Sequence, residues 1–169
     1  MNIEKIRVIK DFPIEGVDFL DITTLLGDAQ AFKETFDELL EKAQVFRPDV
    51  IVALESRGYF FGPALALALN IPFVPIRKKG KLPYKVFSAD YALEYGMASI
   101  EIHQDAITEN KRVLILDDIL ATGGTAAAAV QLVKNFNPSA VELFFLIELS
   151  FLNGREKLKD YSINSLLIK

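Results

Sequence analysis

A chain of 169 residues, 51% hydrophobic and 25% charged, has the length and balance of one globular domain with a substantial core, so we treat residues 1–169 as a single domain. Its net charge of -4 argues against nucleic acids and anionic membranes as partners, because both are bound mainly through basic surfaces. It has no cysteine and a single histidine, His103, which excludes disulfides, thiolate metal sites and histidine clusters. We expect a cytoplasmic protein, and we assign His103 a structural role.

The first element along the chain is an amphipathic helix over residues 29–43. Apolar side chains recur every three or four residues, while the charged ones face elsewhere. Asp28 precedes the helix directly and is placed to cap its N-terminus. The apolar stripe consists of Phe32, Phe36, Leu39, Leu40 and Ala43.

Short apolar runs then alternate with helices. The runs are continuous and rich in β-branched residues, as expected for strands covered on both faces. They span residues 50–54, 73–76, 113–116 and 141–147. An Ala/Leu-rich helix ends near Leu69, and an Ala-rich helix spans residues 125–136. This alternation predicts βαβ units, and hence an α/β fold with a central, mainly parallel sheet flanked by helices. Ligands of such sheets bind beyond the carboxyl ends of the strands.

The stretch over residues 78–99 shows no clear core period. It is rich in polar, aromatic, Gly and Pro residues. We interpret it as a long excursion from the sheet, able to act as a flexible flap.

The strongest motif joins the strand over 113–116 to the helix that begins near Thr125. Gly123 and Gly124 lack a Cβ atom, so the turn can aim successive backbone N–H groups at one phosphate, which the helix N-terminus also attracts. Thr122 and Thr125 add hydroxyl donors. The motif matches neither the P-loop nor the dinucleotide-binding glycine pattern.

Asp117 and Asp118 stand between this strand and the glycine turn. Carboxylates that faced a phosphate would repel it, so their targets are hydroxyl donors or a metal ion, and a ribose offers two adjacent hydroxyls. The plainer interpretation is that the two acids only end a strand.

The whole pattern over 113–125 resembles the type I phosphoribosyltransferases, whose signature is a strand, two acids and a Thr-Gly-Gly-Thr phosphate loop. The resemblance implies the type I phosphoribosyltransferase fold, with a small hood from about 1–27 and the carboxyl-terminal segment, and a flap over about 78–99. It implies that Asp117 and Asp118 hold the ribose hydroxyls. The 5′-phosphate would lie in a cradle of Ala121, Thr122, Gly123, Gly124 and Thr125.

Segments over residues 12–22, 55–63, 76–96 and 148–158 are similar to the adenine-specific branch of that family. The branch converts adenine and 5-phosphoribosyl 1-diphosphate into AMP and diphosphate, in purine salvage. The resemblance implies Mg2+ as cofactor, held mainly by substrate and water, with no certain protein ligand. It also implies a homodimer.

The resemblance assigns diphosphate binding to Ser56, Arg57, Arg77 and Lys81, with a non-proline cis peptide in the loop 55–58. The residue types agree, because arginine presents a fork of donors to phosphate oxygens and residues 77–81 concentrate positive charge in an acidic protein. A lone arginine after a strand is more often a surface ion-pair member. Lys78 and Lys79 are left open as solvated charges.

The resemblance places the base against Phe19, where backbone groups near Asp18 and Leu20 would recognise it. Glu94 and Tyr95 would close over the base, with Glu94 forming a hydrogen bond to, or exchanging a proton with, an adenine ring nitrogen. One position departs from the pattern, since family members often have Arg where this chain has Leu20.

The catalytic residues implied by the resemblance are Arg57, Glu94, Asp117 and Asp118. We expect displacement at the anomeric carbon through an oxocarbenium-like transition state, with positive charge from Arg57, Arg77 and Lys81 on the leaving group. Two alternatives stay open: transfer to another purine base, and a non-catalytic regulator that senses phosphoribosyl diphosphate or nucleotides.

Overall fold

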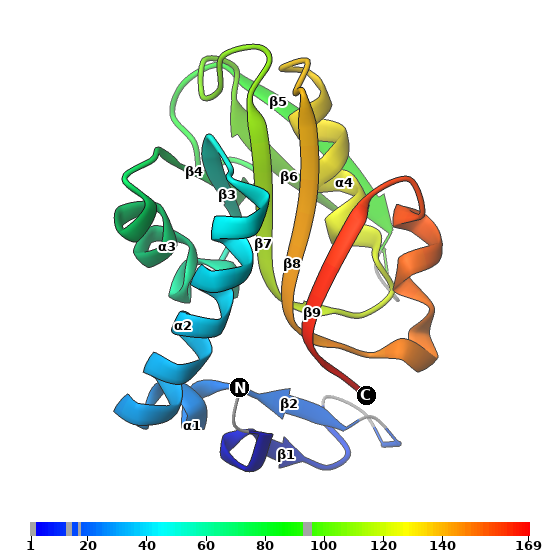
Figure 1. Ribbon diagram of the computed structural model, residues 1–169. Coiled ribbons are helices and arrows are strands. Elements are labelled where there is room, and N and C mark those ends of the chain that lie inside the picture. The colour runs from blue at the N-terminus through cyan, green and yellow to red at the C-terminus, as the bar shows by residue number, and fades with distance from the viewer. Residues whose placement is uncertain (1–2, 13–14, 17, 93–95) are drawn as a thin grey trace.

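A seven-stranded sheet lies at the centre of the computed structural model, which describes residues 3–12, 15–16, 18–92 and 96–169 (Figure 1). Its strands are β3 (Val50–Leu54), β4 (Phe73–Lys78), β5 (Val86–Ala92), β6 (Met97–His103), β7 (Arg112–Leu120), β8 (Ala140–Glu148) and β9 (Ser162–Ile168). Their spatial order is β5-β6-β4-β3-β7-β8-β9. The pairs from β4 to β9 are parallel, and β6 joins β4 and β5 in antiparallel register. The predicted α/β fold with a mainly parallel sheet is confirmed.

Helices cover both faces of this sheet. The α-helices are α1 (Thr23–Leu26), α2 (Ala29–Phe46), α3 (Gly62–Leu69) and α4 (Gly124–Lys134), and the 3-10 helices are η1 (Ile3–Lys5), η2 (Arg57–Phe60), η3 (Ser150–Leu152) and η4 (Gly154–Leu158). In Figure 1, α2 and α3 lie on one side of the sheet and α4 on the other. In the part of the chain that the structure describes, no helix combines the length and apolarity needed to cross a membrane.

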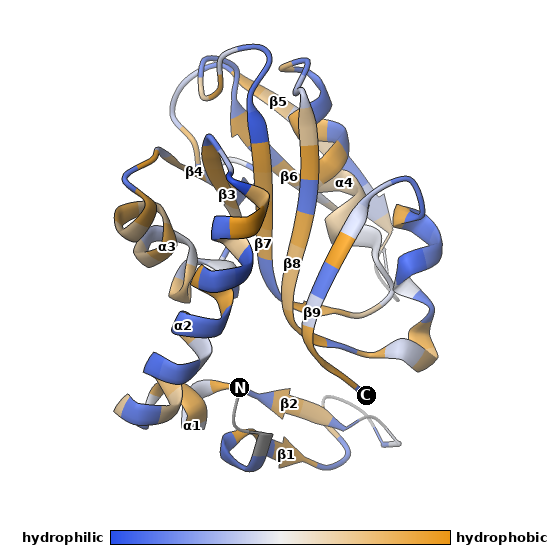
Figure 2. Ribbon diagram, in the orientation of Figure 1, coloured by the Kyte–Doolittle hydropathy of each residue, from blue (hydrophilic) through white to orange (hydrophobic). Residues whose placement is uncertain are grey.

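Alternate side chains along the central strands pack into two separate hydrophobic cores, one on each face of the sheet. Ile51 and Leu114 pack with residues of α2 and α3, whereas Val52 and Ile115, their neighbours in sequence, pack with residues of α4. Figure 2 shows a continuous hydrophobic stretch along the middle of β7, with a hydrophilic band on either side of it. A strand that is apolar on both faces needs helices on both sides, which is why the continuous apolar runs predicted the layers correctly.

Helix α2 begins where the sequence predicted and ends later. The Asp28 carboxylate accepts hydrogen bonds from the backbone N–H groups of Gln30 and Ala31, which confirms it as the N-cap. The helix continues to Phe46 rather than residue 43, because Arg112 from β7 donates to the Phe46 carbonyl at 2.6 Å and satisfies the last turn.

The stretch over 78–99 is not the excursion that we predicted. Residues 86–92 and 97–103 form the hairpin β5-β6, paired from Val86 with His103 to Ala92 with Met97. Ala89 and Ile100 are buried in the core beside α4. The pattern is weak in the sequence because β5 exposes the polar Ser88 and Asp90, while β6 carries the charged Glu101 at a buried position. Whether the hairpin acts as a flap stays a prediction.

A second, two-stranded sheet lies apart from the first. Strands β1 (Arg7–Ile9) and β2 (Phe19–Asp21) pair in antiparallel register. Figure 1 shows this small sheet next to the C-terminus, at the edge of the main sheet where its parallel strands end. This sheet falls within the segment assigned to the hood. Strand β9 of the carboxyl-terminal segment pairs with β8 in the main sheet.

Candidate functional site

The two acids lie inside β7 rather than after it. We predicted a strand over 113–116, but β7 continues to Leu120 because Asp117 pairs with Phe145 and Leu120 pairs with Glu148 on β8. As neighbours on a strand, Asp117 and Asp118 project to opposite faces. The Asp118 N–H donates to Asp117 Oδ1 at 2.9 Å. Asp118 is buried, with 2% of its surface exposed, whereas Asp117 is half-buried.

Burial raises the pKa of both carboxyl groups, so their ionised forms are disfavoured. Loss of water raises the pKa of Asp117 well above its ordinary value, and the neighbouring Asp118 charge raises it further. Burial also raises the pKa of Asp118, although Arg57 opposes that shift. Such acids favour ligands that donate hydrogen bonds to them, as a sugar diol does.

The glycine turn after β7 forms a cradle at the N-terminus of α4. Gly123 is the N-cap and has a φ of 76°, a left-handed conformation that favours glycine. A Cβ atom there would lie 2.4 Å from the Gly154 carbonyl oxygen, so no side chain fits. The turn borders a cavity of about 170 Å³, lined by Arg57, Asp117 and residues 119–126. These include all five predicted phosphate-binding residues.

A second cavity, of about 340 Å³, adjoins the first and shares Arg57, Asp117 and Thr125 with it. Its lining residues are Glu55, Ser56, Arg57, Lys78, Tyr91, Asp117, Asp118 and Thr125. The structure therefore brings Ser56 and Arg57 of the predicted diphosphate loop to the acids and the glycine turn. The peptide bond between Glu55 and Ser56 is cis, as the resemblance implied for this loop.

Arg57 connects the loop to the acids and to the small sheet. Its Nε atom lies 2.6 Å from Asp118 Oδ2, and its guanidinium carbon lies 5.5 Å from the centre of the Phe19 ring. Helix η2 can approach β7 this closely because Gly58 has no side chain: a Cβ atom there would lie 2.6 Å from the Leu116 carbonyl oxygen. Arg57 thus stands where ribose, diphosphate and base sites would meet.

Arg77 and Lys81 do not line either cavity. Arg77 Nε donates to Glu55 Oε2 at 3.2 Å, and Arg77 Nη1 donates to the Lys81 carbonyl at 3.3 Å. Burial disfavours the charge on Glu55, but the Lys78 amide and Arg77 together hold the pKa of Glu55 below its ordinary range. The lysine that does reach the second cavity is Lys78, which the sequence left open as a solvated charge.

Tyr91 is a lining residue that the sequence missed. It lies two positions beyond the buried Ala89 on β5, on the same side of the strand. The period-two pattern of β5 was the signal that could have found it.

The predicted base-binding residues divide between two places. Phe19 packs edge-on against Phe12 with ring centres 5.4 Å apart, beside Arg57. Asp18 and Leu20 instead line an apolar cavity of about 350 Å³, with residues such as Val8 and Leu149. Glu94 and Tyr95, which were predicted to close over the base, lie outside the described residues.

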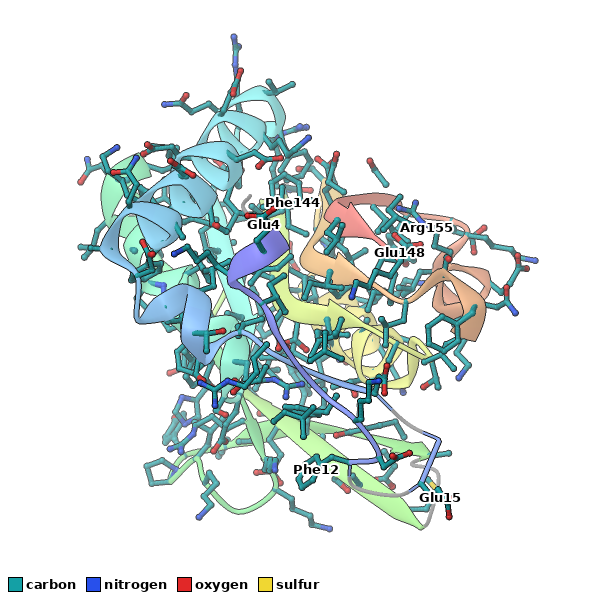
Figure 3. All side chains as sticks on the ribbon, turned by 90° about the horizontal axis from the view of Figure 1, so that it is seen from below. Glu4, Phe12, Glu15, Phe144, Glu148 and Arg155 are labelled. Carbon is teal, nitrogen blue, oxygen red and sulfur yellow. The ribbon has the colours of Figure 1, made fainter. Side chains whose placement is uncertain are left out.

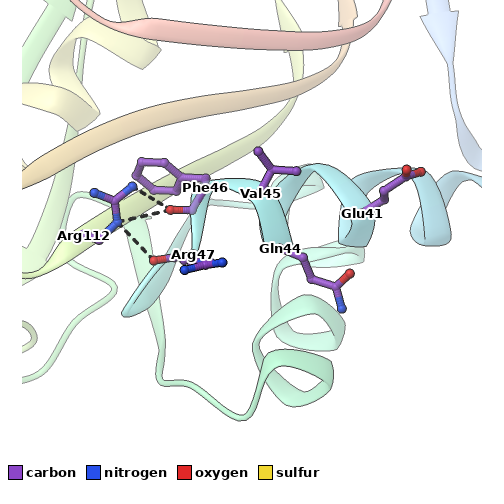
Figure 4. A pocket seen from close by; sticks show the side chains of 6 residues that line it. All are labelled: Glu41, Gln44, Val45, Phe46, Arg47 and Arg112. Atoms are coloured by element: carbon purple, nitrogen blue, oxygen red, sulfur yellow. Dashed lines mark hydrogen bonds between the residues drawn. The ribbon is translucent and has the colours of Figure 1, made fainter.

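A cavity larger than the two at the acids lies elsewhere. It measures about 780 Å³ and is lined by Glu41, Gln44, Val45, Phe46, Arg47 and Arg112 (Figure 4). Arg112 uses its donors on the carbonyl groups of Phe46 and Arg47. This hollow lies at the amino end of β7, opposite the acids, and its arginine completes the end of α2.

Comparisons with known proteins place nearly the whole chain beside one family. The model of the phosphoribosyl transferase domain family matches residues 24–167. Adenine phosphoribosyltransferase of Acetivibrio thermocellus is 51% identical over 164 residues, covering 96% of each chain. The crystal structure of the enzyme of that name from Thermoanaerobacter pseudethanolicus shares 47% identity and a TM-score of 0.94, over 98% of this chain and 96% of that one.

A third relative carries ligands. The crystal structure of adenine phosphoribosyltransferase from Saccharomyces cerevisiae, complexed with an imino-altritol bisphosphate and adenine, is 42% identical with a TM-score of 0.91. It covers 96% of this chain and 94% of its own.

Proposed function

The chain belongs to the phosphoribosyltransferase family, and on that premise we propose that it transfers the phosphoribosyl group of 5-phosphoribosyl 1-diphosphate to adenine, forming AMP and diphosphate for purine salvage. One observation carries the proposal: Asp117, Asp118, Arg57 and the glycine turn surround two adjoining cavities at the carboxyl end of β7. Relatives about half identical over nearly the whole chain bear the name of this enzyme, and the yeast relative was crystallised with adenine.

The arrangement suits a sugar phosphate. Backbone N–H groups of the turn and the helix N-terminus would bind the 5′-phosphate, with hydroxyl groups from Thr122 and Thr125. Asp117 and Asp118 would accept hydrogen bonds from the ribose hydroxyls and hold the anomeric carbon in position for attack. The acids and the turn line two adjoining cavities, so one ribose 5-phosphate would contact both.

Arg57 would stabilise the charge that develops on departing diphosphate. In the described structure its partner is Asp118, a buried acid whose pKa is raised. Because such an acid gives up its charge readily, an incoming anion can replace it as the partner of the guanidinium. Arg77 is paired with Glu55 and would reach the diphosphate only by exchanging that partner. Lys78 lines the cavity already, and we propose it alongside the predicted Lys81 as a source of positive charge.

Magnesium is part of the proposal. We assign the ion mainly to oxygens of the substrate and water. The carboxylates that line the second cavity are Glu55, Asp117 and Asp118. When bound, the ion would neutralise leaving-group charge as a Lewis acid.

The base would lie beside Phe19, whose ring stands next to Arg57. Leu20 is buried and lines a different cavity, so recognition at this position would use the backbone rather than the side chain. We also propose that Glu94 and Tyr95 close over the base, and that Glu94 forms a hydrogen bond or exchanges a proton with an adenine ring nitrogen.

We also propose a cytoplasmic homodimer. Helix α3 is apolar in sequence throughout, yet Leu67 on it is 83% exposed. A helix that is hydrophobic all round is normally covered, so α3 is the surface that we expect a second copy to bury. Light scattering should give twice the monomer mass, and Leu67→Glu should reduce that mass.

The activity is tested by mixing the protein with Mg2+, phosphoribosyl diphosphate and radiolabelled adenine. Labelled AMP is expected. Folded protein that binds phosphoribosyl diphosphate yet releases no diphosphate would instead support the sensor alternative. Competition by hypoxanthine and guanine in the same assay separates adenine transfer from transfer to another purine.

A further inference from the structure

An ion pair between a buried carboxylate and an exposed arginine holds the segment after β8 in place. Glu148, the last residue of β8, is 4% exposed and accepts two hydrogen bonds from Arg155, at 2.5 Å from Nε and 2.7 Å from Nη2. The Ser165 hydroxyl on β9 donates to the same carboxylate at 2.7 Å. Figure 3 shows Glu148 and Arg155 next to one another. One carboxylate therefore ties both η4 and β9 to the end of β8.

Gly154, the residue before Arg155, packs directly against the glycine turn. A Cβ atom added to Gly154 would lie 2.2 Å from the Ala121 carbonyl oxygen and 3.1 Å from the Gly123 backbone nitrogen. The contact is equally close from the other side, since a Cβ atom on Gly123 would meet the Gly154 carbonyl at 2.4 Å. With backbone against backbone, a shift of Gly154 must shift the turn.

The register of the sheet brings the ion pair to the start of the same turn. Glu148 pairs with Leu120, the last residue before Ala121, and the Leu149 N–H donates to the Leu120 carbonyl at 2.9 Å. Hydrogen bonds from Arg155 hold the pKa of Glu148 below its ordinary value, although burial opposes the shift, so the pair is ionised at neutral pH. Neither residue lines the two cavities of the site.

We propose that Glu148 and Arg155 are positioning residues for the 5′-phosphate: their ion pair presses Gly154 against Gly123 and sets the direction of the backbone N–H groups in the turn. This inference rests on the proposed function, because it takes the turn to be the phosphate site. Arg155 and Glu148 act through Gly154 and not on the substrate. Their loss should weaken phosphate binding rather than slow the bond-breaking step.

The test is calorimetric titration of ribose 5-phosphate into the wild type and Arg155→Ala, with steady-state kinetics on the same proteins. A displacement of the turn by about 1 Å should raise the Kd for ribose 5-phosphate, and the KM for phosphoribosyl diphosphate, about 10- to 100-fold. The kcat should change much less. A folded Arg155→Ala protein with unchanged Kd overturns the inference.

Glu142→Gln is the matched control. Glu142 is also a buried carboxylate of β8 that accepts hydrogen bonds from β9, from the Ser162 hydroxyl at 2.8 Å and the Asn164 amide at 2.6 Å. It pairs with Leu114, far from the turn. Loss of this link should lower the melting temperature while leaving the Kd for ribose 5-phosphate unchanged. An equal loss of binding in Glu142→Gln would show general loosening of β9 and would also overturn the inference.

Arg155→Lys covers the case in which Arg155→Ala does not fold. Lysine keeps the charge and loses the two-pronged contact, so its Kd should lie above that of the wild type, and a wild-type Kd contradicts the inference. The two proposals fail differently. Wild-type protein that binds ribose 5-phosphate but forms no AMP refutes the activity alone, whereas wild-type protein that does not bind ribose 5-phosphate refutes the positioning role.

Discussion

The two ends of β7 each meet an arginine, and the molecule uses the two arginines differently. At the amino end, Arg112 donates to the carbonyl groups of Phe46 and Arg47. Its guanidinium carbon lies 4.5 Å from the centre of the Phe46 ring. At the carboxyl end, Arg57 faces the carboxylate of Asp118. Both arginines border a cavity, and the cavity at the amino end has the larger volume.

The two arginines differ in the protein groups that would lose a hydrogen-bond partner if the guanidinium bound a ligand instead. The carbonyl groups that Arg112 satisfies belong to the last turn of α2, which would lose its partners if Arg112 turned to a ligand. Asp118 is a buried acid with a raised pKa, and a ribose hydroxyl can replace the arginine as its partner. An arginine with an exchangeable partner marks a binding site better than cavity volume does.

The largest expected effect is on turnover, from Arg57→Ala. Removal of a preorganised donor to the leaving group should lower kcat/KM about 10²- to 10³-fold, with little change in the melting temperature. Steady-state assays with phosphoribosyl diphosphate and adenine measure this, and Arg57→Lys should retain part of the activity. A full rate in Arg57→Ala would remove Arg57 from the mechanism.

Arg112→Ala should produce the reverse pattern. Loss of charge-assisted hydrogen bonds to the end of α2 should lower the free energy of unfolding by about 2 kcal/mol, because those carbonyl groups lose their partner. Urea denaturation measures the change. Activity of the folded fraction should match the wild type, and a selective loss of kcat/KM would contradict the contrast between the two arginines.

A smaller effect on stability is expected from Asp117→Asn. Burial and Asp118 raise the pKa of Asp117, so its ionised form destabilises the unliganded protein as pH rises above the ordinary value of 3.8. Neutral asparagine should therefore raise the free energy of unfolding at pH 7 by roughly 1 kcal/mol, while turnover falls because the ribose contact weakens. The gain should vanish below the ordinary pKa, and a destabilised Asp117→Asn protein at pH 7 would refute this account.

The smallest effect should come from acid titration of Glu148. Its pKa is held below the ordinary value of 4.5 by Arg155, so the pair stabilises the fold above that pH, and the contribution disappears as pH falls through the lowered pKa. Urea midpoints of wild type and Glu148→Gln should differ at neutral pH and converge in acid. Parallel curves down to the lowest pH would show that the pair contributes nothing through its charge.

Local patterns in the sequence determined much of this protein. The apolar runs predicted the parallel strands and both helix layers, because a strand covered on both faces must be apolar on both. Asp117, Asp118 and the turn 121–125 fall within the single stretch 117–125, so their juxtaposition needed no knowledge of the rest of the chain. Arg57 was identified by its motif, and the structure places it against Asp118.

Only the tertiary structure decided which distant residues complete the site. Lys78 and Tyr91 line a cavity with the acids because β4 lies in the same sheet as β7 and β5 packs against α4, and half-exposed strands carry a weak pattern. The contact of Gly154 with Gly123 likewise depends on how η4 returns from β8. Sequence periodicity records whether a side chain is buried but not which remote residue it meets, since that follows from strand order and register across the whole sheet.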